Sequence, residues 1–449
     1  MSEKIQTSGM RTFSIVWLGQ VVSLLGTGMT RFAITIWAWQ MTGEATALAL
    51  VGFFAFGPTI LLSPVAGALV DRWNRKLVMM VSDLAAGLST VVLMGLFFTD
   101  NLQIWHLYLA GAFAGAFEAF QFPAYSAAIT TMMPKEQYAR ASGMLSLAES
   151  ISGIAAPILG GSLLAFTSLG GILIIDMVTF LFAIGTLLLV HIPQPNISQA
   201  GETGQGSLWS ESLYGFRYIM VRPSLLGLQL VFFAGNFIGM MVFVLIPAMV
   251  LARTDNNELI LGSVQSMMGA GGLVGGLVLS LWGGFRRRIH GILLGWILVG
   301  LLEGVLLGLG QTAAVWAIAA FLAAFFIPFI NGSNQAIWQA KVEPDVQGRV
   351  FAARRLIAQI AGPVSLLLAG PLADYIFEPA LMPNGSLVPF LGGLLGVGPG
   401  SGMALMLVLI GLGMMLVGSC GYMVRVIREV ESIVPDHDAR PTVAAEAMA

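Results

Sequence analysis

Long apolar runs recur along almost the whole chain, separated by short polar breaks. A helix of about 20 apolar residues crosses the hydrocarbon core of a bilayer, and continuous rather than alternating runs favour helices over barrel strands. The pattern predicts an all-α membrane protein with twelve transmembrane helices. The runs lie near residues 12–41, 46–70, 77–98, 104–131, 142–166, 169–190, 223–251, 259–283, 289–310, 313–339, 352–376 and 401–424.

The composition excludes a water-soluble protein. Hydrophobic residues make up 57% of the 449-residue chain and charged residues 10%, whereas soluble proteins carry about 25% charged residues. The first run is too long for the apolar core of a signal peptide, so we expect it to remain as a span. The single cysteine, Cys420, excludes an intramolecular disulfide framework and a cysteine-based metal cluster.

Lysine and arginine indicate the orientation of the predicted spans. With a cytoplasmic N-terminus, all but two of the 21 basic residues fall on the cytoplasmic side, as the positive-inside rule requires. The exceptions are Arg253, in an outer loop, and Arg31, within the first span. We therefore predict cytoplasmic termini and a multi-pass protein of the plasma (inner) membrane.

A long break at 191–222 divides the chain into six spans plus six. Apolar residues recur at helical spacing between Leu208 and Met220, which predicts a short helix along the membrane interface. "AAPILGG" around Pro157 is matched by "AGPVSLLLAG" around Pro363, and such a repeat predicts two six-helix bundles. The predicted parts are an N-terminal bundle at 1–190, a linker at 191–222, a C-terminal bundle at 223–425 and a tail at 426–449.

The break between the second and third spans, "GALVDRWNRK", carries a dense cluster of charges. Its residues Gly67, Asp71, Arg72, Arg75 and Lys76 resemble the signature of the major facilitator superfamily at this place. "GFRYIMVRP", "FPAYSAAITTMMPKEQYARASG" and "FEPALMPNGSLVPFLGGLLG" resemble its branch of drug:proton antiporters, which contains macrolide-efflux and siderophore-export proteins. The resemblance implies the twelve-helix major facilitator fold across the whole chain.

In the resembled fold this loop lies where the two bundles touch on the cytoplasmic side. Asp71 would accept hydrogen bonds at the N-terminus of a facing helix, most readily span 11, where the macrodipole is positive. Arg72, Arg75 and Lys76 would hold the loop at the anionic membrane surface and pair with acids nearby, while Gly67 permits close helix packing. We expect these contacts to close an inner gate; a plain topogenic signal is the alternative.

Charged residues deep within spans are costly, at about 2.5–3.5 kcal/mol each on insertion scales. In the resembled fold, spans 1, 4, 7 and 10 line a central cavity, which makes Arg31 and Glu118 a cavity-facing pair. We expect Glu118 to take and release the driving proton, with Arg31 tuning its pKa and Glu149 as a second station. A permanent structural ion pair between Arg31 and Glu118 is the alternative.

Other acids within the spans have simpler explanations. Asp83 lies one to two turns from Lys76, so we expect it to pair with the basic residues of the loop; a role in carrying protons is the alternative. Asp176, Glu303 and Asp374 lie toward the ends of their spans, where snorkelling or helix capping accounts for them.

Aromatic, methionine and amide side chains on the cavity-lining spans are the candidate substrate contacts. They suit a large, mostly apolar, weakly cationic small molecule such as a macrolide. For any single Phe or Met, packing or lipid contact is the alternative. The candidates are Phe32, Trp37, Phe113, Phe117, Phe120 and Gln121 in the first half, and Asn236, Met240, Met241, Asn331, Asn334 and Gln335 in the second.

"SGIAAPILGG" in the fifth span resembles the antiporter motif of the family. Pro157, Gly160 and Gly161 match it, while Ser152 and Ala156 replace glycines. Small residues and a proline allow this span to pack tightly and bend at the bundle interface, and the resemblance favours export. Generic small-residue packing is the alternative.

The predicted function is proton-coupled export of amphipathic small molecules by alternating access. Export of an endogenous siderophore or secondary metabolite is the runner-up, followed by import and by a non-transporting membrane sensor. The sequence lacks the Gly-x-x-x-x-Gly-Lys string of an ATP-driven pump, and its four scattered histidines give no arrangement for an enzyme. We expect a monomer that acts on protons and a small-molecule substrate in the bilayer, without cofactor, metal ion or nucleic acid.

Overall fold

The computed structural model describes residues 9–132, 137–190, 208–343 and 346–437, and every element within these ranges is helical. The first half contains α1 (Met10–Thr42), α2 (Ala45–Arg72), α3 (Arg75–Phe98), α4 (Ile104–Met132), α5 (Tyr138–Leu164) and α6 (Leu169–Leu189). The second half contains α8 (Leu208–Met220), α9 (Pro223–Arg253), α10 (Glu258–Trp282), α11 (Arg288–Val299), η2 (Gly300–Leu306), α12 (Leu307–Leu309), α13 (Ala313–Lys341), α14 (Gln347–Leu372), η3 (Ala373–Phe377), α15 (Glu378–Leu381), α16 (Val388–Leu395), α17 (Ser401–Met423), α18 (Arg425–Arg428) and α19 (Val430–Ile433).

Each predicted apolar run coincides, to within a few residues, with one helix or with a run of consecutive helices. Among the described residues, eleven stretches have the length and hydropathy that a membrane crossing needs. Helix α4 is 29 residues long but is not one of the eleven. The protein is therefore an all-helical, multi-pass membrane protein, and the count of twelve spans stays a prediction.

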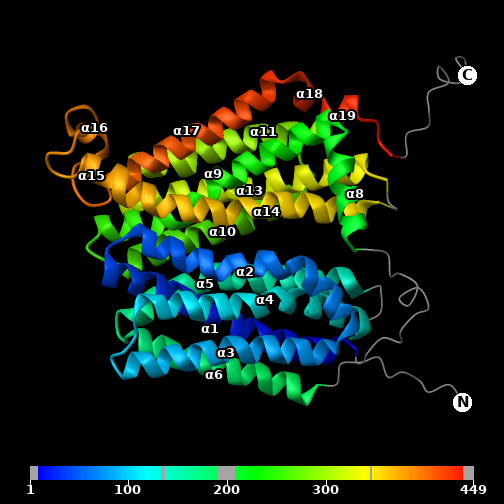
Figure 1. Cartoon of the computed structure of the whole chain (residues 1–449), viewed down its shortest axis with the longest axis horizontal. Coiled ribbons are helices and arrows are strands. Elements are labelled where there is room, and N and C mark those ends of the chain that lie inside the picture. The colour runs from blue at the N-terminus through cyan, green and yellow to red at the C-terminus, as the bar shows by residue number, and fades with distance from the viewer. Residues whose placement is uncertain (1–8, 133–136, 191–207, 344–345, 438–449) are drawn as a thin grey trace, which may run out of the picture.

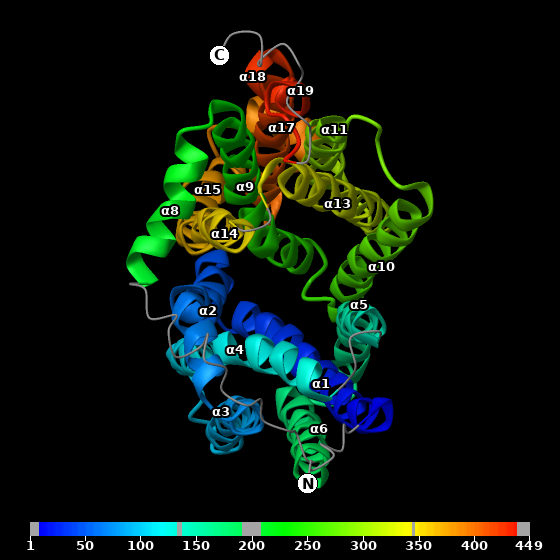
Figure 2. The same ribbon diagram turned by 90° about the vertical axis from the view of Figure 1, so that its right-hand side faces the viewer.

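The long helices form two groups that face each other (Figures 1 and 2). Helices α1 to α6 make up the first group, and α9 to α15 with α17 make up the second. Helix α8 lies at one end of the molecule and α16 at the opposite end (Figure 1). We refer to these as the α8 end and the α16 end, and successive long helices run between them in alternating directions.

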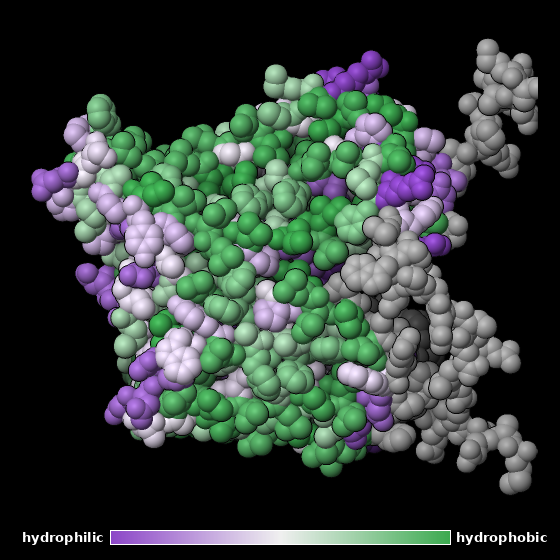
Figure 3. Space-filling view, in the orientation of Figure 1, coloured by the Kyte–Doolittle hydropathy of each residue, from purple (hydrophilic) through white to green (hydrophobic). Residues whose placement is uncertain are grey.

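Apolar side chains cover the middle of the face shown in Figure 3, and hydrophilic residues gather toward its two ends. Large side chains such as Leu61, Leu88, Leu181 and Leu416 are exposed on their helices. A water-soluble protein does not expose contiguous apolar surface on this scale. The band fits the hydrocarbon layer of a bilayer, with the polar ends in the interfaces.

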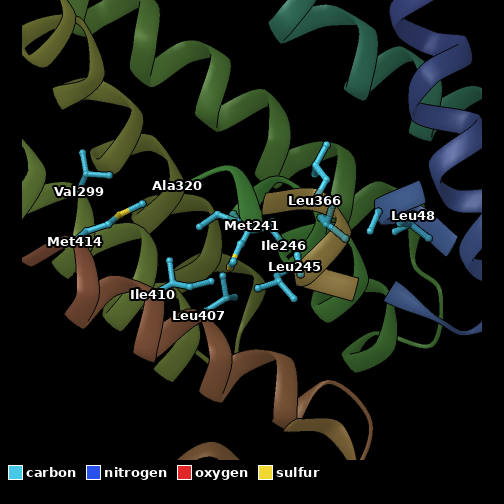
Figure 4. Close-up of a cluster of buried hydrophobic side chains, with 14 of the residues drawn as sticks. Leu48, Met241, Leu245, Ile246, Val299, Ala320, Leu366, Leu407, Ile410 and Met414 are labelled. Carbon is cyan, nitrogen blue, oxygen red and sulfur yellow. The ribbon is translucent and has the colours of Figure 1, made fainter. Parts of the chain in front are cut away.

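Packing is dense in the second group, where α9, α14 and α17 meet (Figure 4). Leu245, Leu366 and Leu407, one from each helix, are fully buried in one apolar cluster. Lipid tails are as apolar as leucine, so burial alone does not hold these helices together. Van der Waals contact between well-fitted side chains supplies the attraction instead.

The helix predicted between Leu208 and Met220 is present as α8 and packs on α14, and its place at the membrane interface stays a prediction. The hydroxyl of Tyr218 donates a hydrogen bond to Oε2 of Glu343 at 2.7 Å, and the guanidinium of Arg222 lies 3.5 Å from the centre of the Tyr218 ring. The hydrogen bond from Tyr218 lowers the pKa of the Glu343 carboxyl. The remaining predicted linker, 191–207, and the tail from 438 lie outside the described residues.

Replacing Tyr218 with Phe is expected to loosen α8 at neutral pH. The change removes the hydroxyl that donates to Glu343, at a cost of about 1 kcal/mol, or roughly five-fold in local opening. Because the bond lowers the Glu343 pKa, its stabilisation is complete above the ordinary carboxyl pKa and is lost as the pH falls through the lowered value. Hydrogen–deuterium exchange of the α8 amides measures both effects.

Tyr214→Phe is the matched control, since the Tyr214 ring contacts Arg349 and its hydroxyl has no hydrogen bond with a described residue. Equal acceleration in both variants, or a difference from wild type that persists at strongly acid pH, contradicts the assigned bond.

Candidate functional site

A cavity of about 320 Å³ lies between the two groups and mostly within the first. Its wall is built from α1, α2, α3, α4 and α6, with smaller parts from α9 and α10. This volume is at the lower end of the range for drug-sized ligands. The polar side chains of the wall are Gln20, Ser23, Thr27, Thr30, Arg31, Thr35, Ser82, Asp83, Ser89, Thr90, Glu118, Gln121, Asp176 and Gln265.

Arg31 of α1 and Glu118 of α4 form an ion pair in this wall. Nη2 of the arginine donates to Oε2 of the glutamate at 2.6 Å. The two side chains are 54% and 46% exposed, so the pair faces the cavity instead of being sealed in the packing between helices. The structure thus brings together the two residues that the sequence pairs, and their role in proton transfer stays a prediction.

Asp83 of α3 is held by amides in the part of the wall nearer the α8 end. Nε2 of Gln20 donates to its Oδ2 at 3.1 Å, and Nε2 of Gln121 donates to its Oδ1 at 2.8 Å. The predicted pairing of Asp83 with Lys76 is wrong. Nζ of Lys76 donates instead to the Val190 carbonyl at 2.6 Å, at the end of α6 where carbonyl groups lack helical partners.

Asp176 of α6 is also part of the wall and is only 5% exposed. Oγ1 of Thr90 donates to its Oδ2 at 2.9 Å, and Oγ1 of Thr27 donates to its Oδ1 at 3.4 Å. The predicted snorkelling of Asp176 is therefore wrong, because the carboxylate points inward. Gly26 of α1 leaves room for it: a Cβ there would lie 3.0 Å from Oδ1 of Asp176 and 2.0 Å from Oγ1 of Thr179.

The remaining predicted residues of the first half are dispersed. Gln121 lines the cavity, whereas Phe117 and Phe120 line a separate apolar pocket between α2, α3 and α4. Phe32 is buried against Gly160 of α5, so it serves packing and does not reach the cavity. Three more lie elsewhere: Glu149 is exposed on α5 and outside the cavity wall, Phe113 lies against Phe117, and Trp37 packs on the main apolar core.

In the second group the predicted amides lie outside this cavity, and one of them, Gln335, binds Arg354 of α14. Nη2 of Arg354 donates to Oε1 of Gln335 at 2.9 Å, and Asn334 is 4% exposed. Gln335 is therefore held by a contact between helices, and Asn334 is buried in the helix packing of the described structure. Of the others, Asn331 is exposed, Asn236 and Met240 are half-buried, and Met241 is in the apolar core.

Several wall residues are absent from the sequence prediction, although a signal for them exists. Gln20, Ser23, Thr27 and Thr30 follow one another at intervals of three and four residues, which places them on one face of a helix. Arg31 continues that polar face. A polar stripe along an otherwise apolar span indicates a water-filled cavity or a functional contact.

The predicted gating loop is described only in part. Helix α2 extends through Gly67, Asp71 and Arg72, whose side chains lie outside the described residues, and α3 begins at Arg75. Lys76 binds the Val190 carbonyl, which belongs to the first group. The contacts of this loop with the second group stay a prediction.

At the α16 end the two groups are joined by Asp374 of η3. Its Oδ1 accepts from the Ala45 amide at 2.9 Å, and its Oδ2 accepts from the Thr46 amide at 2.7 Å and from the Thr46 hydroxyl at 2.6 Å. The predicted capping role of Asp374 is confirmed, and the helix that it caps is α2 of the opposite group. The negative charge also suits the positive end of the α2 macrodipole.

Helices α5 and α10 make a second contact between the groups near the α16 end. A Cβ on Gly262 would lie 2.6 Å from the Pro157 carbonyl oxygen, and a Cβ on Gly161 would lie 2.8 Å from the Glu258 carbonyl oxygen. The two helix backbones can approach this closely because glycine has no side chain to keep them apart. Nε2 of Gln40 adds a hydrogen bond to Oε1 of Glu258 at 3.0 Å. Pro157 and Gly161 of the predicted antiporter motif therefore lie where the groups meet.

Comparison with known proteins gives relatives along most of the chain. A family model described as Major Facilitator Superfamily matches residues 16–366. Macrolide efflux protein A of Streptococcus pyogenes is 27% identical over 367 residues, covering 81% of this chain and 90% of that protein. Multidrug efflux pump Tap of Mycolicibacterium fortuitum is 28% identical, covering 78% and 86%. Enterobactin exporter EntS of Shigella flexneri is 26% identical over 220 residues, covering 48% and 52%.

Solved structures share the fold. A bacterial homolog of the human lysosomal transporter Spinster, in an inward-facing and unoccupied conformation, superposes with a TM-score of 0.68 at 16% identity, covering 91% of this chain and 96% of that one. A bacterial homologue of the iron transporter ferroportin in an inward-facing state gives 0.61 at 14% identity, with coverage of 91% and 99%.

Replacing Asp374 with Ala is expected to loosen the α16 end. The variant loses three hydrogen bonds that hold α2 against the opposite group. We expect a change of about 1–3 kcal/mol, roughly five-fold or more in the ratio of open to closed molecules. Spin labels at Asn101 and Ser386, in a Cys420→Ser background, report the separation of the groups by pulsed electron resonance.

The matched control is Glu44→Ala, which removes an acid at the same end that makes no side-chain cap. We expect a longer-distance population in the Asp374 variant and a wild-type distribution in the control. Identical distributions in wild type and in both variants would show that Asp374 does not hold the groups together.

Proposed function

The chain belongs to the Major Facilitator Superfamily, and from this premise we propose that it is a proton-coupled exporter of amphipathic small molecules. The observation that carries the proposal is the ion pair of Arg31 and Glu118 in the wall of a drug-sized cavity. A transporter that alternates access must expose its coupling carboxyl to water in one state and enclose it in another. A half-exposed glutamate beside one arginine fits this requirement.

In this proposal the protonation state of Glu118 follows the water content of the cavity. When the cavity is wet, the ionised carboxylate is stabilised by Arg31 and by water. When the cavity closes, loss of water penalises the charged form and favours uptake of a proton. Binding and release of the driving proton at Glu118 follow from that difference. We propose Glu149 of α5 as a second site that binds the proton.

The wall also favours a particular kind of cargo. Most of its surface is apolar, and its ionisable side chains are one cation, Arg31, and the three acids Asp83, Glu118 and Asp176. A large apolar molecule with a weakly basic amine fits this excess of acids, as a macrolide does. The likeness to proteins named for macrolide and multidrug efflux supports this class of substrate.

The direction of transport follows from the ends of the molecule. We place the α8 end and both termini in the cytoplasm of the cell, because the basic residues gather there, and the α16 end outside the plasma membrane. Contacts at Asp374 and between α5 and α10 then close the outer side, which supports an inward-facing state ready to load substrate. Gly67, Asp71, Arg72, Arg75 and Lys76 would form the opposing inner gate, and a monomer suffices for the cycle.

Export of an endogenous siderophore or secondary metabolite is the second candidate. The partial match to an enterobactin exporter favours it. The same cavity and the same proton site would serve that cargo, so the two candidates differ in substrate and share their mechanism.

Replacing Glu118 with Gln is expected to abolish uphill transport. Glutamine keeps the size and polarity of the side chain but cannot ionise or carry a proton. In inside-out vesicles under an imposed proton gradient, wild-type protein should accumulate a macrolide or dye, and the variant should accumulate at least ten-fold less. Substrate exchange without a gradient should persist in the variant.

Glu303→Gln is the matched control, because Glu303 lies in the π-helical segment η2 outside the cavity wall. It should transport like wild type. Undiminished gradient-driven accumulation in the Glu118 variant would overturn the proton role of that residue. Failure of the wild type to move any compound of a broad panel would overturn drug export and leave the endogenous substrate.

A further inference from the structure

The described cavity wall contains three acids and one cation. Arg31 forms its ion pair with Glu118, Asp83 takes both of its hydrogen bonds from glutamine amides, and Asp176 is held by threonine hydroxyls. Each acid has a different partner in this arrangement. Only the partner of Glu118 is charged.

The proton cycle raises a difficulty for Arg31. When Glu118 takes a proton, the arginine loses its counter-ion while it still carries its charge. When the closed cavity has lost its water, removing one partner of this ion pair is unfavourable, because the other charge is left uncompensated. Unless another acid can bind Arg31, its charge opposes the protonation of Glu118.

Asp176 is placed to be that acid. Thr27 of α1 touches its carboxylate, and Arg31 follows four residues later, one turn further along the same face. Side chains in a helix lean toward its N-terminus, so the Arg31 side chain is directed back over the turn that holds Thr27 and Asp176.

The hydrogen bonds of Asp176 can accommodate an exchange of partners. The Thr27 bond to Oδ1 is long, at 3.4 Å, and therefore weak, so a guanidinium N–H can replace it. The Thr90 bond at 2.9 Å would continue to hold Oδ2. Asp83 is less suited, because amide donors already bind both of its oxygens.

We propose that Asp176 is a second partner of Arg31, which binds the guanidinium when Glu118 is protonated and releases it when Glu118 ionises. A proton from the cavity forms an O–H bond on Glu118, Nη2 of Arg31 leaves that carboxyl, and the guanidinium donates to Oδ1 of Asp176. Asp176 is thus a positioning residue for the proton site. The inference rests on the proposed proton role of Glu118.

Other charged groups do not take this place in the described structure. Helices α1, α3 and α5 pack against α6. Among their described residues, Arg31 and Asp83 are the charged side chains that face the cavity wall, and Asp83 lies nearer the α8 end. Glu149 of α5 is outside the wall. Glu118 belongs to α4 and binds Arg31.

The test is an infrared titration of the purified full-length protein in lipid nanodiscs, without substrate. The carboxylic acid band that is lost in Glu118→Gln identifies the protonation of Glu118. In Asp176→Asn, Arg31 has Glu118 as its remaining partner, and a negative charge near that site is gone. Both changes favour the ionised form, so the midpoint pH of Glu118 should fall by about one unit, a ten-fold loss of proton affinity.

Two control variants separate this effect from a general disturbance. Asp176→Glu keeps the charge and should keep a midpoint close to that of wild type, and Glu303→Gln alters an acid outside the wall and should leave it unchanged. If Asp176 serves only helix packing, Asp176→Asn lowers the yield or stability of the protein but leaves the Glu118 midpoint where it was. An unchanged midpoint therefore overturns the inference.

A second measurement leaves Asp176 intact, in case its replacement prevents folding. An experimentally determined structure of Glu118→Gln, which imitates the protonated state, should place the Arg31 guanidinium within hydrogen-bonding distance of Asp176. Arg31 still bound to residue 118 contradicts the exchange. Gradient-driven transport that survives in Glu118→Gln defeats the proposed function, whereas an unshifted midpoint in Asp176→Asn defeats only the role of Asp176.

Discussion

A charge in the interior of a membrane protein requires a partner, and the need of Arg31 for a counter-ion governs the organisation of the first group of helices. Its pair with Glu118 joins α1 to α4 across the cavity. Threonines of α1 and α3 collect around Asp176, and glutamines of α1 and α4 collect around Asp83. The apolar spans pack around these polar contacts, which all lie in the wall of the cavity. A proton that changes the partner of Arg31 therefore changes contacts among several helices at once.

The two groups of helices are joined by contacts at the ends of the molecule. Asp374 caps the start of α2 from the opposite group, and the predicted contact of Asp71 would join the other end of α2 to the start of the eleventh span. Under this proposal α2 and the eleventh span, which consists of α14 and the following η3, are joined by a carboxylate cap at each end of the membrane. Alternating access then consists of forming one cap while the other is broken, with the glycine-lined contact of α5 and α10 opening and closing alongside.

The sequence predicts much of the fold, because membrane crossing imposes a length and an apolar content that leave few alternatives. Run by run, the expected spans coincide with helices, and α8 appears where apolar residues recur at helical spacing. The Arg31 and Glu118 pair was also predictable, since two opposite charges in cavity-lining spans each need a partner. The caps and the close glycine contacts were less so, because they depend on which helices become neighbours.

Failures of prediction have a common cause. Asp83 and Asp176 were assigned by their distance along the chain from Lys76 or from a span end, but their partners come from other helices. Phe32, Asn334 and Gln335 were assigned to the cavity by span, whereas the rotation of each helix about its axis turns them into packing contacts. Sequence spacing shows which residues lie on the same face of a helix. Only the assembled structure shows whether that face contacts the cavity, another helix or lipid.

The central claim is that Glu118 carries the driving proton, and it is tested most directly by counting protons. Purified protein in a weakly buffered solution is mixed with erythromycin, a macrolide, and released protons are followed with a pH indicator. At a pH where part of the Glu118 carboxyls are protonated, we expect wild-type protein to release protons on binding, because a cationic cargo favours the ionised carboxylate. We expect Glu118→Gln to bind the compound without release. Equal release from both proteins at equal occupancy would place the proton elsewhere and contradict the account.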